Sequence, residues 1–265
     1  MPPYLKASLA CHAGAAIAAG IAPSTWPWAL GAVAANHLAI AGAGLWPRSS
    51  LLGANVTRLP GAATGRRELA LTIDDGPDPE VTPAVLDLLD AHAVSATFFA
   101  IAERAARHPG LCREIVRRGH SVQNHSDRHS HRFSVLGPKA MAREIASAQA
   151  RLADASGETP RFFRAPAGLR NAFLGPILER LDLQLVSWTR RGFDTVQRSG
   201  DAVLERLARG LAAGDILLLH DGNAARTSAG RPLVLEVLPR LLARCAAADL
   251  RAVTLPAAFG PSQGA

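Results

Sequence analysis

The sequence Leu71-Thr72-Ile73-Asp74-Asp75-Gly76-Pro77-Asp78 places two adjacent carboxylates after an apolar run and before turn residues. The run that precedes them, 69–73, is aliphatic and is predicted to form a buried strand. The aspartates therefore lie where a strand ends, the usual position of catalytic groups in α/β proteins. Two neighbouring carboxylates are costly to bury unless a cation pairs with them, so this stretch indicates a catalytic or metal-binding site.

Histidines that could complete a metal site follow later in the chain. The segment His125-Ser126-Asp127-Arg128-His129 carries two imidazoles four residues apart, which would share one face of a helix. The pair alone is a weak signal, because exposed or core histidines at this spacing are common. With one carboxylate it becomes a His₂Asp set that leaves a position open for water, as in catalytic zinc sites. We expect a divalent metal here, Zn²⁺ first, with Co²⁺ or Ni²⁺ as alternatives.

From Glu68 onward, short β-rich runs alternate with helical patterns, which predicts repeated βα units and a mainly parallel sheet. The alternation amounts to about seven strands in roughly 200 residues, as expected for a closed or nearly closed β/α barrel. The predicted strands are 69–73, 96–100, 121–123, 162–164, 183–188, 216–219 and 252–255. One helix is predicted to begin at Thr82-Pro83. Further helices are predicted around 113–116, 141–152, 171–181, 201–211 and 232–244.

The unusual polar residues follow these predicted strands. Asp74 and Asp75 come after the first strand, His125 after the third, Arg164 after the fourth and His220 after the sixth. In a parallel barrel the carboxyl ends of the strands share one face. We therefore expect these residues to converge on one site.

Composition narrows the possible partners. Net charge is +7 and the pI is about 10.5, but aromatic residues make up only 5% and the arginines are scattered. No basic stripe interleaved with stacking rings is present, so the charge favours anionic surfaces such as lipid headgroups over nucleic acid. Cys11, Cys112 and Cys245 are too few and too widely spaced for a disulfide framework or a CxxC metal site.

The amino-terminal stretch has a different composition from the rest. No Asp, Glu, Lys or Arg occurs between Lys6 and Arg48, and two apolar segments, 7–22 and 29–46, flank a Trp- and Pro-rich break at 23–28. This pattern favours a membrane hairpin, because Trp is enriched at membrane interfaces. Each segment is short for a span of about 20 residues, and His12, Asn36 and His37 are polar. A signal sequence, cleaved or uncleaved, and a helical hairpin packed on a soluble domain are the alternatives.

We divide the chain into an apolar segment at 1–47, a linker at 48–67 and a catalytic domain at 68–265. We expect membrane association, but the side that the domain faces depends on the number of crossings. A hairpin would keep Lys6 and the later arginines, Arg48 to Arg67, on one side, which the positive-inside rule makes cytoplasmic. A single crossing would put the domain outside.

Five segments together resemble the polysaccharide deacetylases, the NodB-homology family of carbohydrate esterase type. The resemblance covers the chain from Glu68 to about Leu255, and the five segments occur in the family's order and spacing. These segments are Thr72-Ile73-Asp74-Asp75-Gly76, His125-Ser126-Asp127-Arg128-His129, Arg161-Phe162-Phe163-Arg164-Ala165-Pro166-Ala167-Gly168, Trp188 to Asp194, and Leu218-Leu219-His220.

The resemblance implies a distorted (β/α)₇ barrel and metal-dependent removal of an acyl group from an amino sugar. It assigns Asp74 as the catalytic base and His220 as the acid. The implied metal ligands are Asp75, His125 and His129. Arg164 would orient Asp74, Asp194 would support His220, and the substrate would contact Leu218, Ala167 and Trp188.

Two positions depart from the family's pattern. Ala167 stands where the third motif often has Tyr, and Thr195 follows Asp194 where Trp is common. Both changes remove aromatic surface that could stack on a sugar ring, which counts against a long polymer and leaves a smaller or lipid-linked substrate open.

The leading hypothesis is a hydrolase that removes N-acetyl groups from an N-acetylated amino sugar or polysaccharide. The alternative is a deacylase or deformylase of a lipid-linked amino sugar in cell-envelope synthesis. A carbohydrate-binding protein without activity is less well supported, since a degenerate site usually loses a metal ligand first.

Overall fold

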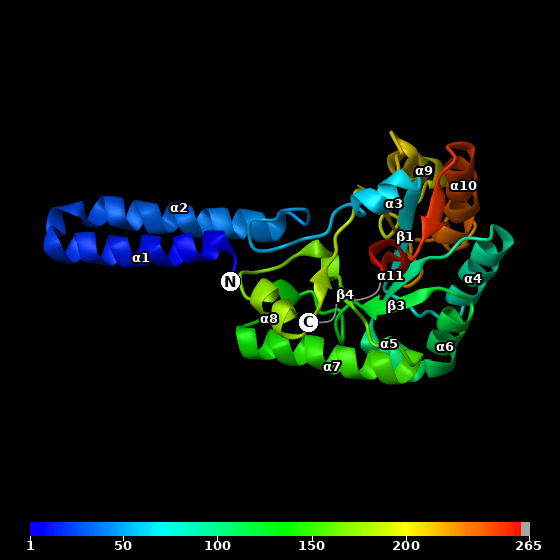
Figure 1. Ribbon diagram of the computed structural model, residues 1–265, viewed down its shortest axis with the longest axis horizontal. Helices are drawn as coiled ribbons and strands as arrows, with labels where there is room; N and C mark the ends of the chain where they lie inside the picture. The colour runs from blue at the N-terminus through cyan, green and yellow to red at the C-terminus, as the bar shows by residue number, and fades with distance from the viewer. Residues whose placement is uncertain (261–265) are drawn as a thin grey trace.

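The computed structural model describes residues 1–260, which form a curled parallel sheet surrounded by helices, with a helical hairpin projecting from it (Figure 1). The sheet order is β5-β4-β3-β2-β1-β7-β6, with β8 beside β1, and every strand pair is parallel. Among the described residues β5 and β6 are not paired, so the barrel is incompletely closed. The strands are β1 Glu68–Asp74, β2 Thr97–Ala100, β3 Ser121–Asn124, β4 Phe162–Phe163, β5 Gln184–Leu185, β6 Arg190–Arg191, β7 Ile216–His220 and β8 Arg251–Val253.

Helices cover the outer face of the sheet, and most of them lie in the segments that connect one strand to the next. In Figure 1, α7 runs along the bottom, α6 and then α4 follow on the right, and α10 and α9 lie at the top. The helices of the barrel are α3 Gly61–Gly65, α4 Thr82–Ala91, α5 Ala102–Arg107, α6 Pro109–Arg117, α7 Pro138–Ser156, α8 Leu174–Arg180, α9 Gly200–Ala208, α10 Leu233–Ala247 and α11 Leu255–Phe259, with single turns at Phe133–Val135 and Pro166–Gly168.

Strand β1 shows how the core is divided. Successive side chains of a strand point to opposite faces. Leu69, Leu71 and Ile73 pack under the helices in the largest hydrophobic cluster, while Ala70 joins the cluster that fills the barrel interior. The same alternation puts Asp74 on the interior face, at the carboxyl end of the barrel.

The predicted barrel of the NodB-homology type is confirmed, with differences in detail. The sheet has eight strands instead of about seven, because β6 is only two residues long and shows no periodicity in the sequence. Thr82 is the first residue of α4, and its buried hydroxyl accepts a hydrogen bond from the Asp78 amide and donates one to Asp221. On this helix Leu86 is fully buried, whereas Leu88 is only partly buried.

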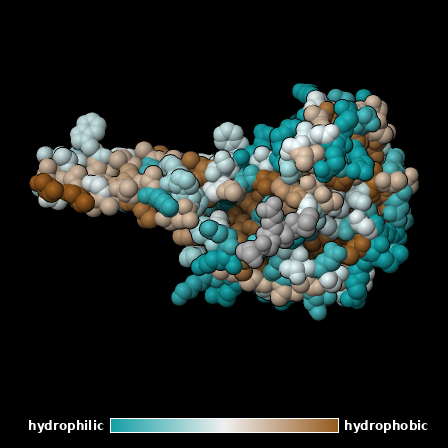
Figure 2. Space-filling model, viewed as in Figure 1, coloured by the Kyte–Doolittle hydropathy of each residue, from teal (hydrophilic) through white to brown (hydrophobic). Residues whose placement is uncertain are grey.

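The apolar amino-terminal segments form two antiparallel helices, α1 Pro3–Ile21 and α2 Trp26–Leu45, joined by a turn at Pro23–Thr25. Both are long and apolar enough to cross a membrane, and only 11% of each apolar window is buried. Figure 2 shows few hydrophilic residues along the hairpin, in contrast to the barrel surface. Large side chains such as Ile21 (81% exposed) and Trp28 (83% exposed) face outward. The hairpin is therefore not packed on the barrel along its length.

The polar residues of the hairpin pair with one another across the two helices. Asn36 donates to Ser8 Oγ at 2.8 Å and accepts from the Tyr4 hydroxyl at 3.1 Å. His12 Nε2 lies 3.1 Å from His37 Nε2. Hydrogen bonds between helices satisfy polar groups in an apolar environment, so these residues do not argue against membrane insertion.

The base of the hairpin is docked on the barrel. Leu5 and Ala43 form a small buried cluster with Leu52, and Gly44 O accepts a 3.1 Å hydrogen bond from the Arg170 amide. Just after α2, the Pro47 carbonyl accepts a 2.6 Å hydrogen bond from Ser187 Oγ. The hairpin end is thus tied to the loops beside β4 and β5.

The segment predicted as a linker, 48–67, lies against the open part of the barrel. Val56 forms a parallel bridge with Val186, just after β5, and the Leu59 amide donates to Gly214 O at 2.8 Å, just before β7. Its chain therefore spans from the β5 side to the β7 side, where the sheet leaves a gap.

Candidate active site

The carboxyl ends of the strands surround a cavity of about 550 Å³. The residues that line it are Asp74, Asp75, Ile101, Glu103, Arg104, Arg107, His125, Arg128, His129, His131, Ala165, Ala167, Gly168, Trp188, Arg191, Thr195, Leu218, His220 and Asn223.

Eight of the ten candidate residues named from the sequence line this cavity. Arg164 and Asp194 are the two that do not line the cavity. Both are buried behind its wall, where Arg164 bonds to Asp74 and Asp194 bonds to His220. All ten candidate residues therefore belong to one connected site, eight by lining it and two through these bonds.

The two adjacent aspartates reach the same cavity because the backbone turns between them. Asp74 ends β1 in extended conformation, and Asp75 has φ 74°, in the left-handed region. This turn breaks the alternation of the strand, which would otherwise send the second side chain to the opposite face. A non-glycine residue held in this region costs free energy and is often found at functional sites.

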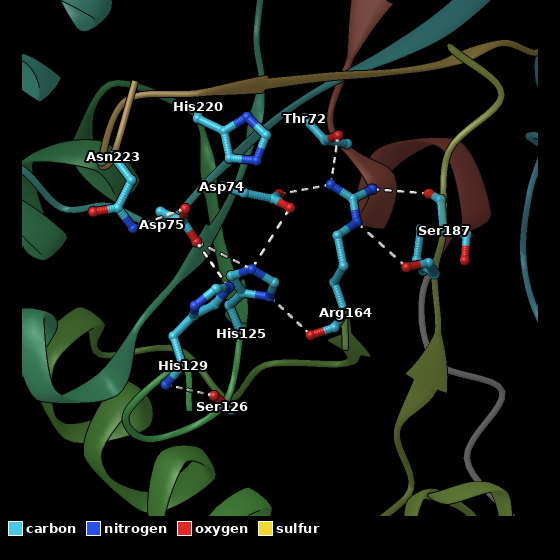
Figure 3. Close-up of polar contacts among 12 residues, drawn as sticks. Thr72, Asp74, Asp75, His125, Ser126, His129, Arg164, Ser187, His220 and Asn223 are labelled. Carbon is cyan, nitrogen blue, oxygen red and sulfur yellow. Dashed lines mark hydrogen bonds and ion pairs between the residues drawn. The ribbon is translucent and has the colours of Figure 1, made fainter. Parts of the chain in front are cut away.

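Asp75, His125 and His129 form the group that could hold a metal ion (Figure 3). Their ligand atoms lie within 4.8 Å of one another, and each histidine Nε2 is 3.3 Å from Asp75 Oδ1. That oxygen is buried and has no hydrogen-bond partner among the described residues. A buried carboxylate oxygen facing two imidazole nitrogens fits a divalent cation of the zinc type, with room for further ligands.

Protonation supports the same conclusion. Burial, helped by the nearby His125, lowers the pKa of His129 to about 4, although Asp75 opposes the shift. Burial raises the pKa of Asp75, but the neighbouring histidines, His125 foremost, outweigh it and hold that pKa below its ordinary value. A neutral imidazole and an ionised carboxylate are the forms that bind metals.

The local structure of this group differs from the sequence prediction. The segment from His125 to His129 was expected to be helical, and this was wrong. It is a loop after β3, with Ser126 at φ 66° and His129 at φ 51°. The His125 Nδ1–H donates to Arg164 O at 2.8 Å, which leaves Nε2 directed toward Asp75.

Arg164 holds Asp74 from inside the barrel. Its guanidinium is 1% exposed and donates to Asp74 Oδ1 and to Thr72 Oγ1, both at 2.7 Å. It also donates to Ser187 O at 2.9 Å and lies 4.1 Å from the centre of the Phe99 ring. Burial lowers the pKa of Arg164, and Asp74 partly offsets this. The other oxygen of Asp74 remains available on the cavity side, 3.7 Å from His125 Nε2.

His220 lies beside Asp74, because the two residues pair in register on β7 and β1, and Asp194 holds its ring. The ring Nδ1 lies 2.8 Å from Asp194 Oδ1, so that Nε2 is the free ring nitrogen. Burial would lower the pKa of His220, but the hydrogen bond and charge of Asp194, with the charges of Asp74 and Asp75, outweigh it and raise that pKa. A buried imidazole that stays protonated to higher pH is suited to donate a proton.

The remaining cavity wall contains the residues proposed to contact substrate. Leu218 and Trp188 are buried in it, and Ala167 lies on a single turn with φ 55°. Gly168 follows with φ 74°, and a side chain there would collide with Trp188 and Pro47. The wall is therefore closely packed around the indole ring.

Sequence reasoning missed two further contacts to Asp75. Asn223 donates to Asp75 Oδ2 at 3.0 Å, and Arg104 donates to the Asp75 carbonyl at 2.9 Å. Asn223 follows β7 by three residues, so its position at a strand end was a usable signal. Arg104 lies on α5, a helix that the sequence did not predict.

Comparison with known proteins gives consistent matches. The family model described as polysaccharide deacetylase matches residues 61–186. A chitooligosaccharide deacetylase from Sinorhizobium fredii is 34% identical over 190 residues, covering 69% of this chain and 88% of that protein. A peptidoglycan-N-acetylglucosamine deacetylase from Bacillus cereus is 31% identical, covering 65% of this chain and 81% of that protein. The solved structure of a family 4 carbohydrate esterase from Streptomyces lividans, in complex with acetate, is 34% identical with a TM-score of 0.63, covering 70% of this chain and 91% of that chain.

Proposed function

Because this chain belongs to the polysaccharide deacetylase family, we propose that it is a metal-dependent hydrolase that removes the N-acetyl group of an amino sugar. The observation that carries the proposal is the buried Asp75 Oδ1, which faces His125 and His129 at 3.3 Å and lacks a hydrogen-bond partner among residues 1–260. Asp74 lies beside this group, and His220 lines the same cavity.

In this proposal Asp75, His125 and His129 hold the metal, which when bound would activate water and polarise the amide carbonyl. Asp74 takes the proton from the attacking water, and Arg164 keeps its carboxylate oriented.

His220 then donates a proton to the leaving amine through its free Nε2. Asp194 fixes the ring by its bond to Nδ1 and stabilises the imidazolium form. Leu218 and Trp188 would shape the part of the cavity that receives the acetyl group and the sugar.

The relatives support this substrate class, because they are named for chitooligosaccharides and for peptidoglycan N-acetylglucosamine. We therefore place an N-acetylglucosamine unit first. A lipid-linked amino sugar, bearing an acetyl or formyl group, is the second candidate, because the exposed apolar hairpin would bring the cavity close to a membrane.

The test uses full-length protein in detergent, loaded with Zn²⁺ or Co²⁺. We expect acetate release from N-acetylglucosamine oligomers and its loss after treatment with a chelator. Formate release from lipid-linked formamido sugars alone would favour the second candidate. Metal binding without turnover of either substrate would contradict both hydrolase proposals and favour a carbohydrate-binding role.

A further inference from the structure

Arg191 stands in the cavity wall and is not explained by the proposed chemistry. It belongs to β6 and pairs in register with Leu218 of β7. Residues paired in this way direct their side chains to the same face of a sheet. Since Leu218 lines the cavity, the register sends Arg191 there as well, and both residues contribute to its lining.

The Arg191 guanidinium has no acidic partner within 4.0 Å among the described residues, and its Nε is buried without a hydrogen bond. Two other arginines of the cavity are already engaged. Arg104 bonds to Asp75 O and Asn223, and Arg107 pairs with Glu103 at 2.8 Å. A buried donor without a partner is costly, so Arg191 is suited to an anionic ligand.

Aromatic rings hold Arg191 in place. Its Cζ lies 5.2 Å from the centre of the Trp188 ring and 4.9 Å from that of Phe193, and Arg206 lies 5.5 Å from the same Phe193 ring. Such stacking orients a planar guanidinium while its N–H groups remain free to bind. Phe193 itself has φ 62°, a conformation that requires support from its surroundings.

This row of side chains leads out of the active site. Arg191 also lines a second cavity of about 530 Å³, together with Arg190, Arg206 and Arg209, and with Glu205 as its acidic residue. Arg190 is neutralised by Asp215. Arg206 has no acidic partner within 4.0 Å in the described part of the chain, so positive charge extends from the catalytic cavity into the second one.

We propose that Arg191, with Arg206 behind it, binds an oxyanion carried by the substrate next to the acylated amino sugar. The oxyanion is a phosphate ester on the sugar or the carboxylate of a neighbouring sugar unit. Arginine suits both, because its planar donors match these oxygens. This inference rests on the proposed function for the sugar, but the anion site itself can be measured by binding alone.

The experiment measures the Kd of full-length metal-loaded protein in detergent for N-acetylglucosamine 1-phosphate, for a disaccharide of N-acetylglucosamine and N-acetylmuramic acid, and for neutral N-acetylglucosamine. The variants are Arg191→Gln, which removes the charge, and Arg191→Lys, which keeps it without the planar fork. Arg143→Gln on the exposed side of α7 is the matched control, because it removes the same charge away from the cavity.

We expect one anionic ligand to bind at least about tenfold more tightly than the neutral sugar, and Arg191→Gln to remove that difference. Arg191→Lys should give an intermediate value, and Arg143→Gln should keep the preference. The tighter anion identifies the source of the oxyanion. Equal preference in wild type and Arg191→Gln would overturn the inference, including the case in which phosphate binds only to the metal. A preference that depends on Arg191 without any deacetylation would support the anion site and contradict the proposed function.

Discussion

Asp194 holds His220 at two points: Oδ1 lies 2.8 Å from the ring Nδ1, and Oδ2 accepts a 2.8 Å hydrogen bond from the His220 amide. One carboxylate thus fixes both the backbone and the ring of the proposed acid. The sequence suggested this support only through the family resemblance, because 26 residues separate the two.

Replacing this carboxylate should change the pH profile. The acid form of His220 is lost as pH rises through its pKa, and Asp194 raises that pKa. Asp194→Asn should therefore move the alkaline limb of the rate profile to lower pH and reduce kcat by about 10²-fold. Metal content, measured in parallel, should not change. An unshifted alkaline limb would exclude this role for Asp194.

The metal group can be tested with a matched histidine pair. His129→Ala should lower Zn²⁺ occupancy strongly, because it removes one of three protein ligands. His131→Ala removes a nearby exposed imidazole that also lines the cavity and should keep the metal. Equal metal content in both variants, measured after dialysis, would remove His129 from the site.

Variants of Asp74 and Asp75 should distinguish the proposed catalytic base from the proposed metal ligand. Asp74→Asn keeps the metal group intact and should reduce turnover by at least about 10²-fold with the metal still bound. Asp75→Asn should lose both metal and turnover, because its Oδ1 faces the two histidines. The opposite pattern of metal loss would mean that the two roles are reversed.

Asp221 should make the protein less stable at neutral pH than at acidic pH. Burial raises its pKa to about 6, although hydrogen bonds from Thr82 and the Gly222 amide oppose the shift. Between pH 3.8 and about 6 the folded state therefore binds more protons at Asp221 than the unfolded state does. The free energy of unfolding falls as pH rises through that window, and the contribution of Asp221 is constant above it. Across the whole window the free energy of unfolding decreases by about 3 kcal/mol because of Asp221.

Urea unfolding at several pH values can isolate this contribution. The difference in unfolding free energy between wild type and Asp221→Asn should change between pH 3.8 and about 6 and stay constant above that window. Asp154→Asn makes the same replacement at an exposed position of α7 and is the matched control. A pH-independent difference for Asp221→Asn would contradict the raised pKa.

The hairpin predicts how the protein fractionates. Its two helices leave large apolar side chains exposed, including Ile21, Trp28 and Leu38. We expect full-length protein to remain with membranes in high-salt washes, because salt screens headgroup attraction but not hydrophobic insertion. Extraction by detergent should release it. Recovery in the soluble fraction without detergent would contradict membrane anchoring.

The sequence predicted the long, regular features well. Strand β1 was clear because it is a continuous apolar run, and helix α7 was clear because apolar residues recur along one face. Met141, Ile145 and Leu152 of that face are buried. Strand β6 was missed because two arginines carry no such period.

Part of the candidate site could be predicted from the sequence, and the parallel sheet is the physical reason. Residues at strand ends converge because the sheet is parallel, and this placed Asp74, His125 and His220 together. The loop conformation at Ser126 and His129 was not predictable, since left-handed backbone at such residues depends on the surrounding fold. Arg191 was overlooked because an arginine pair in sequence usually indicates a solvated surface.

The hydrogen bond between Ser187 Oγ and Pro47 O begins a chain of contacts from the hairpin to Asp74, the proposed catalytic base. The Ser187 carbonyl also accepts a hydrogen bond from Arg164, and Arg164 donates another to Asp74. Three hydrogen bonds therefore link the end of α2, through Ser187 and Arg164, to the Asp74 carboxylate. A protein that begins at Arg48 would lose the first of these bonds along with the hairpin, and its base would be less firmly aimed even where metal still binds. We therefore expect the hairpin to influence the turnover rate as well as the location of the protein.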